Sequence, residues 1–228
     1  MSRRSRFALS FALLCGLALV AVWVVSIYTG LGRRADLHVS VSSATHVYYH
    51  PGLSSALRGF ATLCNPGPYA VLAAGVLTIA LVLRGPRIAL ILFGVLAAPN
   101  LLTQFLKHAL ANDRMGNVHI ARIDPACWPS GHATASLVLA GCAVIAAPAV
   151  LRPLVAGAGA VFALLIGIAV VGLGWHFPSD VLGGWAMAGL FLSIGYGVVR
   201  DEPVASAARL PQRFFGTVGA ARENEQQV

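Results

Sequence analysis

A histidine and an aspartate, four positions apart, stand where two long apolar stretches meet in the segment AVVGLGWHFPSD, residues 169–180. If Asp180 accepts the proton of one imidazole nitrogen of His176, the ring tautomer is fixed and the other nitrogen keeps its lone pair facing outward. That arrangement makes a histidine a directed nucleophile or a metal ligand. Pro178 suits the first turn of a helix and Asp180 suits its positive N-terminus, so a helix cap beside an interfacial histidine is the alternative interpretation.

A second candidate group lies in the segment CWPSGHATAS, residues 127–136. We expect Ser130 to cap a helix whose first turn contains His132. A helix N-terminus presents unpaired N–H groups to an anion, and Gly131 would let the backbone approach a phosphate closely. A surface histidine behind an ordinary serine cap is the alternative. However, the dipole at a helix N-terminus disfavours an imidazolium, and this placement favours a role in proton transfer.

Polar side chains recur at helical spacing in the segment PNLLTQFLKHALANDR. Asn100, Thr103 or Gln104, and Lys107 form one stripe that ends at a membrane surface. Polar groups inside a membrane are costly and usually face the interior of the bundle. The stripe is therefore either part of an anion site that includes Lys107, or a hydrogen-bonded seam between helices with a lysine that extends to the surface.

The elements that position these residues are predicted to be membrane-spanning helices. The 228 residues are only 11% charged, against about 25% in soluble domains. A helix needs about 20 apolar residues to cross a bilayer, and six charge-free windows are candidates: 7–29, 66–83, 88–106, 133–151, 153–175 and 181–199. We predict an all-α integral membrane bundle of six transmembrane helices in residues 1–200, followed by a polar, disordered tail in residues 201–228.

The distribution of basic residues predicts the orientation of this bundle. Cytoplasmic segments carry the excess of Lys and Arg, and a cytoplasmic N-terminus places ten of the sixteen basic residues on that side. All seven histidines then fall in loops or helix ends on the opposite side, where the long connections 30–65 and 107–132 also lie. We predict a multi-pass protein of the cell membrane with both termini cytoplasmic and the site extracytoplasmic. Because the basic residues sit between apolar spans, we expect the bilayer and no nucleic acid as partner.

Together, the three segments resemble the motifs of the type-2 phosphatidic acid phosphatase superfamily. Its members include membrane lipid phosphate phosphatases, polyprenyl-diphosphate phosphatases and the soluble vanadium haloperoxidases, and its motifs read K-x6-R-P, P-S-G-H and S-R-x5-H-x3-D. The sequence offers Lys107-x6-Arg114, Pro129-Ser130-Gly131-His132 and His176-x3-Asp180. The six predicted spans match the membrane branch of the family.

The resemblance implies a metal-independent phosphatase that needs no cofactor and acts on a lipid phosphate. His176 would attack phosphorus and become a phosphohistidine, with Asp180 orienting it. His132 would protonate the departing lipid oxygen and then activate water. The phosphoryl oxygens would be held by the remaining motif residues, Lys107, Arg114, Ser130 and the Gly131 backbone. Such positioning and charge neutralisation are what phosphoryl transfer mainly requires.

The sequence departs from the family motifs at two places. Met115 replaces the proline of the first motif, and Ala169 and Val170 replace the Ser-Arg pair of the third. Losing a charge-assisted contact to the transition state typically costs orders of magnitude in rate. Arg122, in the loop between the first two motifs, is the candidate substitute, and a solvated loop charge is its alternative interpretation.

The four cysteines divide by location. Cys15 and Cys142 fall within predicted spans and are expected to pack as small hydrophobic side chains. Cys64 and Cys127 fall on the extracytoplasmic side, where disulfides persist. A disulfide between them would tie the first outer connection to the site, and two free thiols are the alternative.

We therefore predict hydrolysis of a lipid phosphomonoester or diphosphate, in the class of phosphatidate, phosphatidylglycerol phosphate or a polyprenyl diphosphate. A lipid phosphotransferase, which passes the phosphoryl group from His176 to another acceptor, is one alternative. The other is a non-catalytic lipid-phosphate-binding protein, which the replacement of an arginine by Val170 favours. Both histidines and Asp180 are retained, and mere binding would not need them.

Overall fold

The computed structural model describes residues 3–114 and 123–200, which form helices and no strands. The α-helices are α1 (Arg3–Tyr28), α2 (Gly30–Tyr48), α3 (Pro51–Ala61), α4 (Pro66–Arg84), α5 (Pro86–Ala109), α6 (Gly131–Ala146), α7 (Arg152–Gly172) and α8 (Pro178–Arg200). Two short 3-10 helices, η1 (Thr62–Cys64) and η2 (Ala149–Leu151), join them. The predicted all-α class is confirmed, and the predicted tail, 201–228, lies outside the described residues.

Five of these helices are long and apolar enough to cross a membrane, namely α1, α4, α5, α7 and α8. In place of the predicted span 133–151 stands α6, a shorter apolar helix of 16 residues. It ends at Ala146 because a residue that precedes a proline is disfavoured in helical conformation, and Ala147, before Pro148, is extended at φ −63° and ψ 148°. The chain is a multi-pass membrane protein by length and composition of its helices, but six spans are not confirmed.

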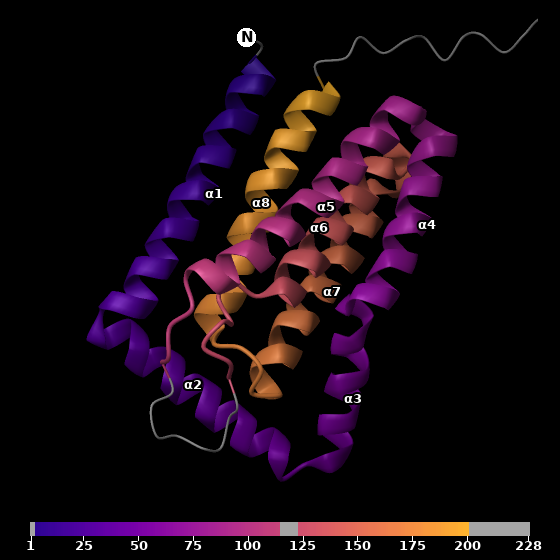
Figure 1. Ribbon diagram of the computed structural model, residues 1–228. Helices are drawn as coiled ribbons and strands as arrows, with labels where there is room; N and C mark the ends of the chain where they lie inside the picture. The colour runs from indigo at the N-terminus through magenta and orange to yellow at the C-terminus, as the bar shows by residue number, and fades with distance from the viewer. Residues whose placement is uncertain (1–2, 115–122, 201–228) are drawn as a thin grey trace, which may run out of the picture.

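The apolar helices alternate in direction around α6 (Figure 1). α6 contacts α4, α5, α7 and α8, whereas α1 packs mainly along α8. The N-terminal end of α1 and the C-terminal end of α8 lie at one end of the bundle, and α2 and α3 lie at the other. Because α5 ends, and α6 and α8 begin, at the same end of the bundle as α2 and α3, the segments that carry the predicted site residues meet there.

Two helices, α2 and α3, occupy most of the segment 30–65, which is predicted from the sequence to be a long connection between spans. The buried face of α2 mixes polar and apolar residues, Asp36, Ser40, Ala44 and Val47. Hydropathy alone gives no signal for such a face, although its three- and four-residue spacing is helical. At this end of the bundle α2 contacts both α7 and α8, and α3 contacts α7.

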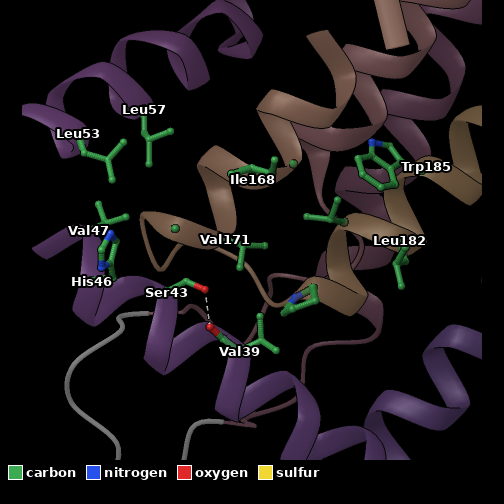
Figure 2. A pocket seen from close by; sticks show the side chains of 14 residues that line it. Val39, Ser43, His46, Val47, Leu53, Leu57, Ile168, Val171, Leu182 and Trp185 are labelled. Carbon is green, nitrogen blue, oxygen red and sulfur yellow. Dashed lines mark hydrogen bonds between the residues drawn. The ribbon is translucent and has the colours of Figure 1, made fainter. Parts of the chain in front are cut away.

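An apolar groove of about 490 Å³ lies between α2, α3, α7 and α8 (Figure 2). Val47 of α2, Leu57 of α3, Val171 of α7 and Leu182 of α8 are among its lining side chains. Pro178, which also borders the groove, begins α8 two residues after His176. The groove therefore borders the start of α8, two residues along the chain from the predicted nucleophile.

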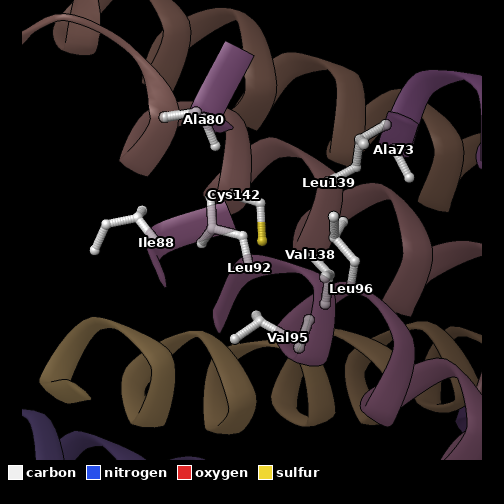
Figure 3. Close-up of a cluster of buried hydrophobic side chains, with 11 residues drawn as sticks. Ala73, Ala80, Ile88, Leu92, Val95, Leu96, Val138, Leu139 and Cys142 are labelled. Carbon is white, nitrogen blue, oxygen red and sulfur yellow. The ribbon is translucent and has the colours of Figure 1, made fainter. Parts of the chain in front are cut away.

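A cluster of buried apolar side chains joins α4, α5, α6 and α8 (Figure 3). Leu92 of α5 and Val138 and Cys142 of α6 are fully buried in it. Close packing continues between α7 and α8, where a Cβ at Gly167 would lie 2.8 Å from the Trp185 ring. The cluster and this close packing fix α6 and α8 behind the ends that carry the site.

Candidate active site

The pair of His176 and Asp180 lies at the start of α8. Pro178 occupies the first helical position, as predicted, so His176 stands just outside the helix. Nδ1 of His176 is 3.3 Å from Oδ2 of Asp180, and the same oxygen accepts the Phe177 N–H at 2.9 Å. Asp180 is fully buried and His176 is 5% exposed. With the Nδ1 proton directed at the carboxylate, Nε2 keeps its lone pair for a substrate.

Backbone hydrogen bonds hold the start of α6 against the start of α8. The Ser130 N–H donates to the Asp180 carbonyl at 2.9 Å, and Thr134 Oγ1 donates to the Gly184 carbonyl at 3.2 Å. Gly184 is needed for this approach, because a Cβ there would lie 2.6 Å from the Ser130 carbonyl oxygen. Ser130 caps α6 as predicted, since its Oγ accepts the Ala133 N–H at 3.4 Å. The two segments that carry the site histidines are thereby fixed side by side.

His132 faces His176 from the first turn of α6. The two ring centroids are 6.3 Å apart. Nε2 of His132 is 3.1 Å from Asn65 Oδ1, and its ring lies against Trp175 with centroids 5.7 Å apart. A carbonyl acceptor favours the tautomer with the proton on Nε2, which leaves Nδ1 as the second functional nitrogen. The pair can therefore place one imidazole as nucleophile and another as acid–base group about the same phosphorus atom.

Arg114 joins two buried carboxylates instead of standing free. Its Nη2 donates to Asp180 and to Cys127 Sγ, the latter at 3.2 Å. Its Nη1 donates to Asp36 Oδ2 at 3.1 Å and to Ser179 Oγ at 2.9 Å. Burial alone would lower the pKa of Arg114, but the Asp180 carboxylate raises the pKa above its usual value. From the sequence, Arg114 is predicted to hold the phosphate; in the structure its terminal N–H groups donate to the two carboxylates, the Ser179 hydroxyl and the Cys127 thiol.

Asp36 of α2 is a site residue that the motifs do not reveal. Its carboxylate accepts the Ser179 N–H at 3.0 Å and the Ser179 hydroxyl at 2.5 Å, in addition to Arg114. It is 5% exposed, and burial raises the pKa of Asp36 while the hydrogen bonds from Ser179 offset part of the rise. It is the single acidic residue among the first 112, which is the signal that could have identified it. Asp36 ties α2 to the start of α8.

The polar stripe of α5 combines both interpretations offered above. Asn100 donates to the Tyr69 hydroxyl of α4 at 3.0 Å, and Thr103 Oγ1 lies 3.4 Å from Thr134 Oγ1 of α6. These residues form a seam between helices. Lys107, at the outer end of the stripe, is half-buried and within electrostatic range of Asp180. Lys107 is thus a cation at the site.

Gly131, at the start of α6, is partly exposed. A Cβ at Gly131 would meet Gln104 Nε2 at 3.5 Å and otherwise only Thr103 at 3.9 Å. These are ordinary van der Waals distances, and the partly exposed first turn of α6 can present N–H groups to an anion. Within residues 3–114 and 123–200, no three His, Cys, Asp or Glu side chains are grouped as metal ligands would be.

Comparisons with known proteins agree with the geometry. The model of the PAP2 superfamily matches residues 88–203, just over half of the chain. The chain belongs to the PAP2 superfamily. Its fold is similar to the crystal structure of a transmembrane PAP2-type phosphatidylglycerolphosphate phosphatase from Bacillus subtilis, with a TM-score of 0.72 and 21% identity over 82% of this chain and 95% of that one. No curated protein matches the sequence. The predicted family is confirmed, and it supports a lipid phosphatase.

The position of the missing PAP2 arginine is part of the apolar core. Val170 is fully buried in a cluster with Ala133 and Val181. Its carbonyl oxygen accepts the His176 N–H at 3.2 Å, so the backbone here holds the loop although the side chain supplies no charge. Arg122, the predicted substitute, lies outside the described residues.

The predicted disulfide of this PAP2 protein is not formed, and Cys64 and Cys127 are free thiols. Cys64 packs against Ala135 and Ile166, whereas Cys127 lies in a separate cluster and accepts a hydrogen bond from Arg114. Burial raises the pKa of both thiols to about 12. Each cysteine is therefore an inert packing residue in its own cluster.

Proposed function

We propose that the protein hydrolyses a lipid phosphomonoester or diphosphate at the extracytoplasmic face of the cell membrane, through a phosphohistidine. The observation that carries the proposal is the buried His176–Asp180 pair together with His132, whose ring centroid lies 6.3 Å from that of His176. Membership of the PAP2 superfamily supports a phosphatase. The substrate class is phosphatidate, phosphatidylglycerol phosphate or a polyprenyl diphosphate, and the similar Bacillus subtilis protein is described as a phosphatidylglycerolphosphate phosphatase.

The first step is attack of His176 Nε2 on phosphorus. The bond from phosphorus to the lipid oxygen breaks, and that oxygen takes the electron pair and a proton from Nδ1 of protonated His132. Positive charge develops on the ring of His176, and Asp180, 3.3 Å from Nδ1, stabilises it. The product is a phosphohistidine and a free lipid alcohol or lipid phosphate.

The second step reverses the role of His132. Its Nδ1, now neutral, takes a proton from water, and the water oxygen attacks the phosphohistidine. The phosphorus–nitrogen bond breaks, inorganic phosphate leaves, and both histidines return to their starting states. Asn65, on Nε2 of His132, keeps the ring oriented through both steps.

Charge on the transferred phosphoryl group is neutralised by few groups. Lys107, Ser130 and the N–H groups near Gly131 face it from α5 and α6, and Arg122 remains a proposed contributor. Arg114 contributes by holding Asp180 in place and through the electric field of its positive charge. No metal or cofactor takes part in the proposed steps.

The surroundings of the site favour a lipid as substrate. The apolar groove between α2, α3, α7 and α8, which borders the start of α8, would accept an acyl or prenyl chain (Figure 2). We propose that α6 completes six crossings: it lies inside the bundle and alternates in direction with α5 and α7. At a rise of 1.5 Å per residue it is about 24 Å long, which places the site slightly below the membrane surface. The excess of basic residues then places both termini in the cytoplasm.

Phosphate release from a panel of lipid phosphates in detergent tests the proposal. The wild type is expected to release phosphate from at least one member, and His176→Ala to slow it at least about 1,000-fold, as loss of a nucleophile does. His108→Ala, which removes an exposed histidine at the end of α5, is the matched control and should change the rate less than about threefold. A phosphorylated acceptor in place of free phosphate would identify a phosphotransferase, and no turnover of any substrate would contradict the proposal.

A further inference from the structure

Among the residues that the structure describes, the motif cations leave little free positive charge for a phosphate dianion. The charge of Arg114 is balanced by Asp36 and Asp180, and Val170 supplies none. Lys107 therefore stands alone among the motif cations that the structure describes. A substrate with two phosphates would bring still more negative charge into this end of the bundle.

Arg58, in the last turn of α3, is a cation beside this site that belongs to none of the three motifs. Its Cζ lies 5.7 Å from the centroid of the Trp175 ring, the ring against which His132 packs. Arg58 is exposed, and none of the described carboxylates is within ion-pair distance of it. A guanidinium that lies on an aromatic face keeps its N–H edge available for an anion.

The location of Arg58 indicates which part of the substrate it reaches. In the proposed reaction His132 protonates the leaving oxygen, and Arg58 and Trp175 lie on the His132 side of the site. Leu57, its neighbour on α3, lines the apolar groove (Figure 2). A lipid whose chain occupies that groove would carry its headgroup past Arg58.

We propose that Arg58 binds a second phosphate of the substrate, one that belongs to the leaving group. The inference rests on the proposed phosphatase function and narrows its substrate class to lipids with two phosphates, such as a polyprenyl diphosphate or phosphatidylglycerol phosphate. In a diphosphate the leaving group is itself a phosphate, which gains negative charge as the bond to phosphorus breaks; in phosphatidylglycerol phosphate the leaving group carries a phosphodiester whose negative charge is constant. A guanidinium can bind either phosphate with two parallel hydrogen bonds. The diacylglycerol that leaves from phosphatidate carries no charge for Arg58 to bind.

Steady-state kinetics of Arg58→Gln on matched substrates test this role. The pair is a polyprenyl diphosphate and the monophosphate of the same chain; phosphatidylglycerol phosphate and phosphatidate form a second pair. We expect KM for one or both two-phosphate substrates to rise about 10- to 100-fold, the range for a lost charged hydrogen bond. The values for both single-phosphate substrates should change less than about threefold. A loss confined to one of the two-phosphate substrates identifies whether the second phosphate is an anhydride or a phosphodiester.

Two further variants serve as controls. Arg58→Lys keeps the charge and should recover part of the KM. Arg34→Gln removes another exposed arginine at the same end of the bundle, on α2. This variant should leave the KM for every substrate unchanged. An equal loss for diphosphate and monophosphate would overturn the proposal, because Arg58 would then act on the transferred group or on folding. No loss for either two-phosphate substrate would overturn it as well.

A binding measurement separates failure of this proposal from failure of the phosphatase. The polyprenyl diphosphate and the monophosphate are titrated into His176→Ala, with and without Arg58→Gln, where no turnover occurs. An affinity for the diphosphate that is about 10- to 100-fold weaker without Arg58, with the monophosphate unchanged, supports the role even if the wild type hydrolyses nothing. Equal affinities with and without Arg58 would overturn it.

Discussion

The two histidines of the site are held in opposite ways. His176 is anchored through Asp180 to a run of buried charges that reaches across three segments of the chain. His132 has a neutral hydrogen-bond partner, Asn65, and a ring contact. A nucleophile must attack from one fixed position, and buried charged networks are rigid. An acid–base group must exist in both protonation states, which a neutral partner does not oppose.

The largest loss of rate should come from breaking the charged network of His176 at its central residue, Asp180. Asp180→Asn cannot accept the His176 proton as a carboxylate does, and it leaves Arg114 with one of its two charged partners. We expect kcat to fall about 1,000- to 10,000-fold, as replacement of a carboxylate that orients a histidine does elsewhere. Phosphate release measures the rate, and size-exclusion chromatography checks the fold. A folded Asp180→Asn protein with a rate within tenfold of wild type would contradict this account of the pair.

A smaller effect is expected at the far end of the same network. Asp36→Asn removes one of the two buried carboxylates that pair with Arg114, and it weakens the hydrogen bonds between α2 and Ser179. We expect kcat to fall about 10- to 100-fold because Asp180 is less well placed, with a lower unfolding temperature in the same detergent. Asp124→Asn, at an exposed turn, is the matched control. If both variants behave like the wild type, the network does not extend to α2.

At His132, replacing the neutral hydrogen-bond partner Asn65 should alter the pH dependence of the reaction more than its rate. Asn65→Ala should lower kcat about tenfold, since His132 loses one hydrogen bond. Asn65→Asp places a carboxylate near His132 Nε2, which favours the protonated ring. The limb of the pH–rate profile at which acid catalysis is lost should therefore move to higher pH, as kcat/KM measured across pH will show. Superimposable profiles for Asn65→Asp and wild type would show that Asn65 does not govern His132.

The sequence predicts the local parts of this site and not its long-range partners. Pro178 and Ser130 are start signals that act within a few residues, so the starts of α8 and α6 and the places of His176 and His132 follow from them. Asp36 meets Ser179 across 143 positions, and Asn65 meets His132 across 67. No local pattern encodes such pairs. Hydropathy also fails to reveal α2, the helix that carries Asp36, because its buried face mixes polar and apolar residues.

The predicted disulfide shows a further limit of local reasoning. Cys64 and Cys127 are predicted to lie on one side of the membrane, but a shared side does not bring two side chains within bonding distance. In the structure each fills a separate cluster. The same limit applies to Arg114, whose motif position does not reveal that Asp36 competes for its guanidinium.

The smallest effects are expected at these two thiols, of which Cys127 contacts the charged network only through the hydrogen bond it accepts from Arg114. Cys64→Ser and Cys127→Ser should each keep turnover within about threefold of wild type, since neither thiol reacts. With pKa values of about 12, both thiols stay protonated up to about pH 9 and should resist maleimide until the protein is denatured. Mass spectrometry of unreduced protein should find them unpaired. A Cys64–Cys127 crosslink in native membranes would contradict the structure.

The most direct test of the central claim is whether the phosphoryl group resides on His176 during turnover. Protein and excess lipid substrate are mixed, quenched rapidly in alkali, in which a phosphorus–nitrogen bond survives, and digested for mass spectrometry. The account predicts a phosphorylated peptide that contains His176, formed before phosphate appears and absent from His176→Ala. Phosphate release without any adduct on His176, or an adduct on a different residue that forms and decays at the turnover rate, would contradict it.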